Sequence, residues 1–224
     1  MAEQEMKEKI IEQIQKMSGS YTPYTIFTDW VAMMALSIQN ACTMPYGSLW
    51  KAREDKYMEI SKKYKEGELE LLGEMMGMLT LEFGDTGPRD ILGEVYMAAG
   101  CGSKVTGQFF TPFHVSELCA RVSLENIQGS DSVITINEPS AGGGGMIIAA
   151  AKALSDKGIN YQRRMDVTAQ DLDWNGVYMT YVQLSLLGIR ARVIQGNTLT
   201  EPYTGAGYPQ DRVLKTPAYM GVLI

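Results

Sequence analysis

Hydrophobic positions near the start of the chain repeat at intervals of three and four residues. This spacing predicts an amphipathic helix over residues 2–17. Its apolar stripe consists of Met6, Ile10, Ile11, Ile14 and Met17. Gly19 ends the pattern, and Pro23 stands where a first-turn proline begins a new helix. Similar patterns predict helices over residues 48–64, 68–83 and 90–100. We therefore expect an N-terminal helical region over residues 1–102.

The pattern changes from Asp131 onward, where short β-branched runs alternate with helical spacing. The predicted strands are SVITIN (132–137), MDVTAQ (165–170), RARVIQG (190–196) and DRVLK (211–215). Helices are predicted over residues 146–157 and 174–187. Strand–helix alternation at this spacing is typical of βαβ units and a parallel sheet. We therefore expect an α/β domain over residues 103–224.

Charge and cysteine content narrow the functional classes. The formal net charge is −6 and the isoelectric point about 4.9, which argues against strong unaided binding to nucleic acid. Cys42, Cys101 and Cys119 are widely spaced and odd in number, which indicates reduced thiols. The charged N-terminus has no apolar core of a signal peptide, and residues 24–44 fit a buried helix better than a membrane span. We expect a cytoplasmic protein without membrane association.

Four consecutive glycines, residues 142–145, follow the first predicted strand and precede a helix. Such turns bind nucleotide-like ligands in α/β folds, because glycine permits a close backbone approach and positive φ. Asp171 ends the second predicted strand, where its carboxylate can accept hydrogen bonds from both ribose hydroxyls of a nucleoside. These residues leave three alternatives: a nucleoside-containing ligand, a dinucleotide held by its pyrophosphate, or a tight turn without a ligand.

Four segments, in order, resemble the N6-adenine DNA methyltransferases, specifically the modification subunits of type I restriction–modification systems. TGQFFTP (106–112) resembles the family's GQFYTP, and NEPSAGGGGM (137–146) resembles DPACGSGGF. VTAQDLDWNGVYMTYVQLSLLGI (167–189) resembles a strand and helix that read GQEIDPEA…NLxLHGI, and QGNTL (195–199) is similar to GDTL. With DILGEVY upstream, the resemblance covers residues 88–224. It implies the Rossmann-like sheet of the S-adenosylmethionine-dependent methyltransferases.

The resemblance also implies S-adenosylmethionine as the cofactor. The implied binding residues are Phe110, Thr111, Pro112, Glu138, Pro139, Ser140, Ala141, Gly143, Gly145, Asp171, Leu172 and Asn197. The first three would line the methionine end, with Thr111 contacting its carboxylate, and residues 138–145 would lie under methionine and ribose. Asp171 would bind the ribose hydroxyls, and Leu172 would pack on the adenine. Asn197 stands where the family has an Asp that accepts a hydrogen bond from the adenine amino group.

The family transfers a methyl group to the exocyclic amine of a flipped adenine in DNA. An Asn-Pro-Pro-Phe/Tyr segment after the fourth strand orients that amine, and its aromatic ring stacks on the base. DRVLKTPAY (211–219) stands in register with the family's DVVLANPPF, so the implied catalytic residues are Thr216, Pro217 and Tyr219. Thr216 replaces Asn, and Ala218 replaces the second Pro.

Two functional hypotheses follow from this departure. The first is an active DNA adenine N6-methyltransferase. The second is a catalytically inactive, methylase-like protein that binds S-adenosylmethionine and acts through partner subunits. The sequence ends five residues after Tyr219, so we expect a sheet shortened at its C-terminal side. We also expect DNA contacts through a separate specificity subunit, in a homo- or hetero-oligomer.

Overall fold

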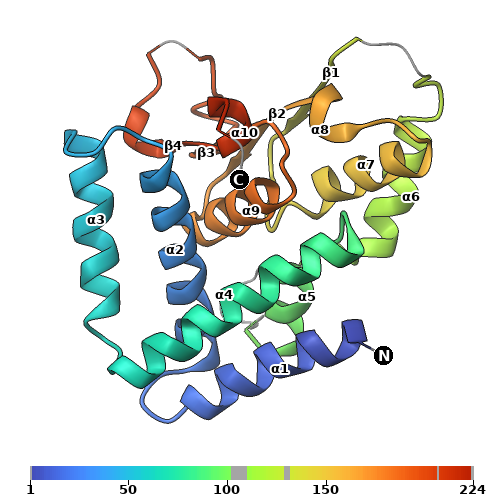
Figure 1. Cartoon of the computed structure of the whole chain (residues 1–224). Coiled ribbons are helices and arrows are strands. Elements are labelled where there is room, and N and C mark those ends of the chain that lie inside the picture. The colour runs from blue at the N-terminus through green and yellow to red at the C-terminus, as the bar shows by residue number, and fades with distance from the viewer. Residues whose placement is uncertain (1, 102–109, 129–131, 206, 223–224) are drawn as a thin grey trace. The chain divides into compact units, whose positions relative to one another are not determined.

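The computed structural model describes residues 2–101, 110–128, 132–205 and 207–222 (Figure 1). The chain divides into two compact units. The first comprises Met1–Gly87 and Ile91–Phe109, and the second comprises Pro88–Asp90 and Phe110–Ile224. The predicted boundary between residues 102 and 103 lies outside the described residues.

The first unit is helical, which confirms the predicted N-terminal helical region. Its described helices are α1 (Ala2–Met17), α2 (Pro23–Ala41), α3 (Ser48–Ser61), α4 (Glu66–Thr86) and α5 (Ile91–Ala98). Pro23 begins α2 as predicted, and the Thr22 Oγ1 atom caps this helix by accepting a hydrogen bond from the Thr25 N–H at 3.1 Å. The rings of Phe27, Trp30 and Tyr96 pack edge to face in the core. Within the described residues, none of the helices is both long and apolar enough to cross a lipid bilayer.

The second unit is an α/β domain, which confirms the predicted fold class. Its helices are α6 (Phe113–Ser123), α7 (Gly145–Asp156), α8 (Tyr161–Arg164), α9 (Trp174–Leu186), the 3-10 turn η1 (Gln210–Arg212) and α10 (Pro217–Met220). Its strands are β1 (Ile134–Glu138), β2 (Met165–Asp171), β3 (Ala191–Gln195) and β4 (Val213–Lys215). They form one sheet in the order β1-β2-β3-β4.

The direction of the last strand differs from the predicted parallel sheet. β1, β2 and β3 are parallel, but β4 runs antiparallel to β3, with Val193 opposite Leu214. Parallel neighbours need a crossover, usually through a helix. In the segment between β3 and β4, the described residues form loops and the short turn η1. The chain therefore turns back beside β3.

The two faces of the sheet have different chemistry. Val167, Ala169, Ala191 and Val193 are fully buried on the face that α9 contacts. Most alternate positions carry polar side chains that are exposed or half-buried; these are Thr135, Asn137, Asp166, Thr168, Arg192 and Lys215. Gln170, Ile194 and Val213 occupy the remaining alternate positions of β2, β3 and β4 and are buried. Parallel sheets are usually covered by helices on both faces. This sheet instead has one apolar face and one mostly polar face, which we call the polar face, with the buried pair Ile194 and Val213 at the end of β3.

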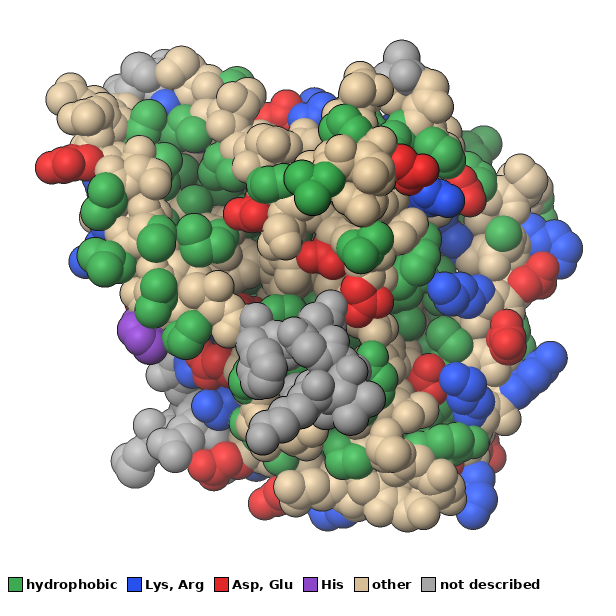
Figure 2. All heavy atoms as spheres, turned by 180° about the vertical axis from the view of Figure 1, so that it is seen from behind, with side chains coloured by type: hydrophobic (Ala, Val, Ile, Leu, Met, Phe, Trp, Pro, Cys, Tyr) green, Lys and Arg blue, Asp and Glu red, His purple; other side chains and the backbone are tan. Residues whose placement is uncertain are grey.

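Helix α6 also has two different sides. Ser116 and Ala120 are buried, and α6 packs against α7. Val115, Leu118 and Val122 are exposed. In the view from behind, hydrophobic side chains lie among charged ones at the surface (Figure 2).

Candidate functional site

The glycine loop and Asp171 lie at the same edge of the sheet. The loop leaves the carboxyl end of β1, and α7 begins at Gly145. Asp171 is the last residue of β2, which is parallel to β1. Gly142 and Gly144 have φ angles of +54° and +90°, a region that side chains disfavour. The glycines therefore make a tight turn from strand to helix, as the sequence predicts.

The Asp171 carboxylate holds this loop directly. Its Oδ2 atom accepts a hydrogen bond from the Gly142 N–H at 2.7 Å, and its Oδ1 atom accepts one from the Asp173 N–H at 2.9 Å. The Ala141 N–H donates to the Gln170 carbonyl at 3.0 Å. Asp171 is 9% exposed. Because each carboxylate oxygen has two lone pairs, both oxygens keep capacity for a further hydrogen bond.

Helix α9 supports the loop with side-chain hydrogen bonds. The Gln183 Nε2 atom donates to the Gly143 carbonyl at 2.7 Å and to the Asp90 carboxylate at 2.8 Å. The Thr180 hydroxyl donates to the Gly142 carbonyl at 2.9 Å. Thr180 and Gln183 are fully buried, and Asp90 nearly so. We call Asp90, Thr180 and Gln183 the loop brace.

A glycine of the same helix allows the close approach. A Cβ atom at Gly176 would lie 3.0 Å from the Gly142 carbonyl oxygen and 3.1 Å from the Asp171 Cγ atom. Sequence analysis missed Gly176 and the loop brace. Gly176, Thr180 and Gln183 share one helix face by their spacing of four and three, a signal visible within an apolar helix. Asp90 carries no comparable signal, because it lies far away in the sequence.

The TGQFFTP segment reaches the loop from another side. A Cβ atom at Gly142 would lie 3.0 Å from the Phe110 ring, so this ring packs on the glycine turn. Thr111 and Pro112 are exposed, and Pro112 immediately precedes α6. Residues 106–109 of the segment lie outside the described residues.

The segment after β3 closes the same edge. The Thr198 hydroxyl donates to the Pro139 carbonyl at 2.7 Å, which ties this segment to the glycine loop. The Asn197 Oδ1 atom accepts a hydrogen bond from the Leu199 N–H at 3.0 Å. Leu172 and Leu199 are exposed, by 66% and 93%. The edge thus combines hydrogen-bonding groups with accessible apolar side chains.

Glu138 adds a second carboxyl group beside Asp171. Burial raises the pKa of the Glu138 carboxyl above its ordinary value, and the nearby Asp171 charge acts in the same direction. A hydrogen bond from the Ser140 N–H at 3.2 Å opposes part of this shift in pKa. A positively charged group bound at this edge would favour the ionised form of Glu138.

The predicted catalytic segment lies at the other end of β3. Thr216 is fully buried; its hydroxyl donates to the Ile189 carbonyl at 2.7 Å and accepts from the Ala191 N–H at 2.9 Å. Asp171 pairs with Gln195, four residues along β3 from Ala191. At about 3.3 Å per residue, these two ends of the strand are roughly 13 Å apart.

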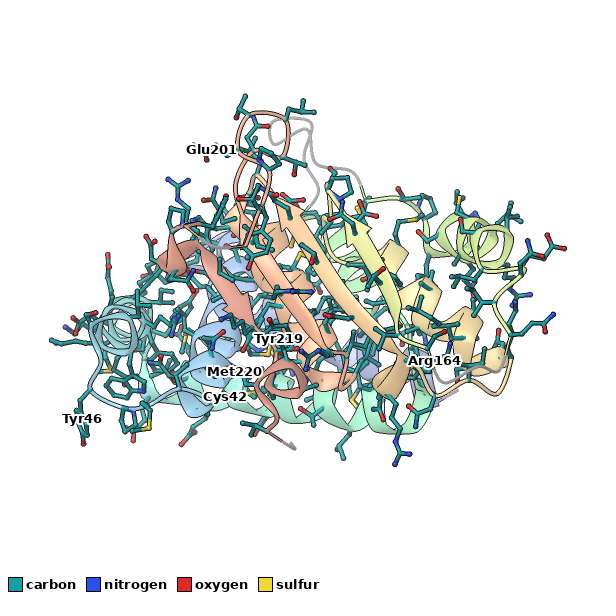
Figure 3. The ribbon with its side chains drawn as sticks, turned by 90° about the horizontal axis from the view of Figure 1, so that it is seen from above. Cys42, Tyr46, Arg164, Glu201, Tyr219 and Met220 are labelled. Carbon is teal, nitrogen blue, oxygen red and sulfur yellow. The ribbon has the colours of Figure 1, made fainter. Side chains whose placement is uncertain are left out.

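The antiparallel direction of β4 explains this placement, because the carboxyl end of an antiparallel strand lies beside the amino end of its neighbour. Pro217 begins α10, and the Tyr219 ring faces the guanidinium groups of Arg190 and Arg192, 4.5 and 5.0 Å from the ring centre. Tyr219 and Glu201, which follows β3, lie toward opposite ends of the strands (Figure 3). The structure does not bring Thr216, Pro217 and Tyr219 to the glycine loop.

Comparison with known proteins gives a family match and several similar structures. The sequence model of the family described as N-6 DNA Methylase matches residues 88–221, more than half of the chain. A protein described as a class I S-adenosylmethionine-dependent methyltransferase from Listeria monocytogenes is 13% identical, with a TM-score of 0.48 over 88% of this chain. The methyltransferase subunit of a type I restriction–modification system from Streptococcus thermophilus is 12% identical, with a TM-score of 0.47 over 92% of this chain. The chain spans 54% and 61% of the lengths of these two proteins. On the family match, the chain belongs to the N-6 DNA Methylase family.

Proposed function

We propose that the chain binds S-adenosylmethionine at the carboxyl edge of β1, β2 and β3, as the cofactor-binding part of a DNA adenine N6-methylation system. The observation that carries the proposal is the contact between Asp171 and the Gly142 N–H, which holds the glycine loop in a formed cradle. Membership in the N-6 DNA Methylase family supports the choice of ligand over a dinucleotide.

The chemistry of the edge fits this cofactor. Asp171 would accept the ribose hydroxyls with its remaining lone pairs, and the exposed Leu172 would contact the adenine ring. Glu138 and Asp171 together suit a ligand that carries a positive sulfonium and a positive amino group. Phe110, Thr111, Pro112 and the loop residues Pro139, Ser140, Ala141, Gly143 and Gly145 would line the methionine side, with Asn197 toward the adenine.

The bound cofactor would supply a methyl group on a positively charged sulfur, an electrophile that an amine can attack. The residues of this chain would hold the ligand, and the loop brace would keep the loop rigid behind it. Such rigidity favours transfer, because reacting atoms must be aligned closely.

Methyl transfer also requires groups that orient the target amine. The Thr216 hydroxyl is buried and hydrogen-bonded at the far end of β3, so it is poorly suited to that task. We therefore propose that a partner subunit supplies the contacts to the target adenine. The second candidate is transfer by this chain through Thr216, Pro217 and Tyr219, which the register of TPAY with the family's motif favours.

Calorimetric titration with S-adenosylmethionine and with its demethylated product tests the binding site. We expect saturable binding of both, weakened roughly ten- to a hundredfold in Asp171→Asn because charge-assisted hydrogen bonds are lost. The exposed Asp211 provides the matched control, since Asp211→Asn removes the same charge outside the site. Absence of binding to the wild-type chain would refute the proposed function.

Incorporation of labelled methyl groups into adenine-containing DNA distinguishes the two candidates. We expect binding of the cofactor without transfer by the chain alone. Transfer by the chain alone that disappears in Tyr219→Ala would establish the second candidate and overturn the requirement for a partner.

A further inference from the structure

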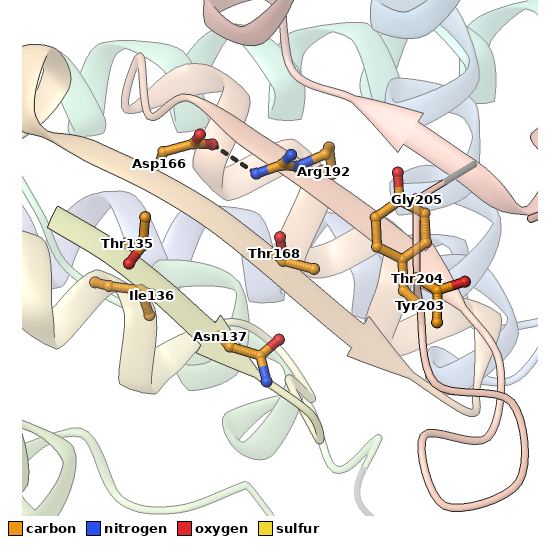
Figure 4. Close-up of a pocket in the computed structure, with 9 residues that line it drawn as sticks. All are labelled: Thr135, Ile136, Asn137, Asp166, Thr168, Arg192, Tyr203, Thr204 and Gly205. Atoms are coloured by element: carbon orange, nitrogen blue, oxygen red, sulfur yellow. Dashed lines mark hydrogen bonds and ion pairs between the residues drawn. The ribbon is translucent and has the colours of Figure 1, made fainter. Parts of the chain in front are cut away.

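We infer that the polar face of the sheet carries a separate binding site for a small phosphate ester, a sugar phosphate or a mononucleotide. The site is a groove of about 400 Å³ that lies across β1, β2 and β3 (Figure 4). This volume falls within the range of small-molecule pockets, roughly 300–1,000 Å³. The groove does not include the glycine loop or Asp171, and its assignment does not rest on the proposed cofactor site.

The floor of the groove carries polar side chains that are available for hydrogen bonds to a ligand. Thr135 and Asn137 come from β1, and Thr168 lies beside Asn137 in the register of β2. In the part of the chain that the structure describes, none of these three side chains makes a hydrogen bond to the protein. Two hydroxyls and an amide can therefore bind hydroxyl groups of a sugar or the polar edge of a base.

One end of the groove carries excess positive charge. The Arg192 Nη2 atom donates to the Asp166 carboxylate at 2.8 Å, and the Arg190 Nε atom lies 3.8 Å from the same carboxylate. Two guanidinium charges thus share one carboxylate. Lys215 of β4 lies opposite Arg192 of β3 in the strand register and adds a third positive charge. Arg192 lines the groove, and its Nε–H is buried without a hydrogen-bond partner among the described residues. In a chain with a net charge of −6, this local excess favours an anionic group.

The opposite wall of the groove is held in place by contacts within the protein. The buried Gln170 amide accepts a hydrogen bond from the Tyr203 N–H at 3.0 Å and donates to the Glu201 carbonyl at 2.8 Å. The Tyr203 ring packs edge to face on Tyr208, whose hydroxyl donates to the Gln195 carbonyl at 3.0 Å. A fixed aromatic wall lowers the entropic cost of binding a flat ring.

These features together define the ligand class. Guanidinium groups bind phosphate well, because their planar donors match its oxygens. The hydroxyls and amide suit a sugar, and Tyr203 suits the face of a sugar or base. The shared chemistry is a phosphate attached to a sugar, with or without a base.

Titration of the full chain, followed by NMR or calorimetry, tests the site with four probes. These are inorganic phosphate, ribose 5-phosphate, adenosine monophosphate and adenosine. At the groove, followed by the NMR signals of its lining residues, we expect the two phosphate esters to bind more tightly than inorganic phosphate, and adenosine to bind most weakly. Equal affinity for the two esters would identify a sugar phosphate, and tighter binding of the mononucleotide would identify a nucleotide.

Two substitutions with opposite expected effects on ligand affinity distinguish a binding role of the charged residues in the groove from a structural role. Arg192→Gln should weaken ester binding roughly ten- to a hundredfold, since it removes a charge-assisted contact. Asp166→Asn should strengthen binding, because it removes the carboxylate that competes for both arginines. Arg212, which pairs with Glu201 outside the groove, provides the control Arg212→Gln with unchanged affinity.

Three results would overturn the inference: no ester binds, Arg212→Gln weakens binding as much as Arg192→Gln, or Asp166→Asn weakens binding. Circular dichroism of each variant shows whether the fold is intact. If Arg192→Gln does not fold, Thr168→Val replaces it, with weaker ester binding expected and unchanged binding counting against the site.

Discussion

Gly176→Ala tests whether α9 supports the glycine loop as closely as the structure indicates. The added methyl group would lie 3.0 Å from the Gly142 carbonyl oxygen and 3.1 Å from the Asp171 Cγ atom. Optimal separations between carbon atoms are about 3.5–4.0 Å, so the loop or the helix must move. Either movement disturbs the hydrogen bond between Asp171 and Gly142.

Two opposing contributions determine how much Gly176→Ala changes the free energy of unfolding. Replacing a helical glycine by alanine stabilises a helix by at most about 1 kcal/mol. Overpacking a buried site costs about 1–3 kcal/mol. We therefore expect a net loss of stability of up to roughly 2 kcal/mol, which lowers the melting temperature by several degrees, at about 2–4 °C per kcal/mol for a chain of this size. Binding of S-adenosylmethionine should weaken as well, because the loop is displaced.

Thermal unfolding with and without S-adenosylmethionine measures both effects. Gly77 in α4 is the matched control, because a Cβ atom there would meet nothing within 4 Å. Gly77→Ala should raise the melting temperature and leave the shift caused by the ligand unchanged. If Gly176→Ala raises the melting temperature as Gly77→Ala does, the close contact between α9 and the loop is refuted.

Substitutions at three further positions test other contacts. Thr216→Val should lower the free energy of unfolding by about 1–3 kcal/mol in urea denaturation, because it leaves the buried Ala191 N–H unsatisfied. Thr216→Ser keeps a hydroxyl and should lower it less. Equal stability of wild type and Thr216→Val would contradict the hydrogen bonds of Thr216. Burial and Asp171 raise the pKa of Glu138, so the folded state binds its proton more tightly and wild type loses stability as the pH rises above the ordinary value of 4.5. Glu138→Gln should remove this loss, and urea denaturation at several pH values would show an unchanged slope if the reasoning is wrong. Gln183→Leu should speed hydrogen exchange of the loop amides, and unchanged exchange would mean that the brace does not rigidify the loop.

Hydrophobic periodicity predicted most of the elements because each one buries a face with its own repeat. The helical spacing over residues 2–17 matches α1, and the β-branched runs match β1, β2 and β3. The turn was predictable because glycine adopts the positive φ angles at residues 142 and 144 without the steric cost that a side chain adds.

The direction of β4 could not be predicted in the same way. An alternation of two residues indicates which side chains are buried, and it is identical for parallel and antiparallel strands. The register of DRVLKTPAY with the family's motif assumes a parallel strand that ends near the loop. The placement of TPAY beside the start of β3 depends on the path of residues 196–212, which no local sequence pattern encodes.

The loop brace illustrates a second limit of prediction from the sequence. Gln183 and Asp90 are 93 residues apart in the sequence, and only tertiary folding brings them together. A buried glutamine in an apolar helix indicates that some polar partner exists, because an unsatisfied amide is costly. The sequence does not identify which partner it is.

The hydrogen bonds from the Gly142 and Asp173 amides to the Asp171 carboxylate link two equilibria that are usually treated separately, the binding of a ligand and the ordering of the glycine loop. Any molecule that binds the same oxygens shares them with the Gly142 and Asp173 amides, so occupancy and local order of the loop rise together. A ligand of this edge should therefore protect residues 139–145 from proteolysis. The affinity lost in an Asp171 variant combines a missing ligand contact with the cost of ordering a loosened loop. A comparison of loop protection in the ligand-free variant and wild type separates these two contributions.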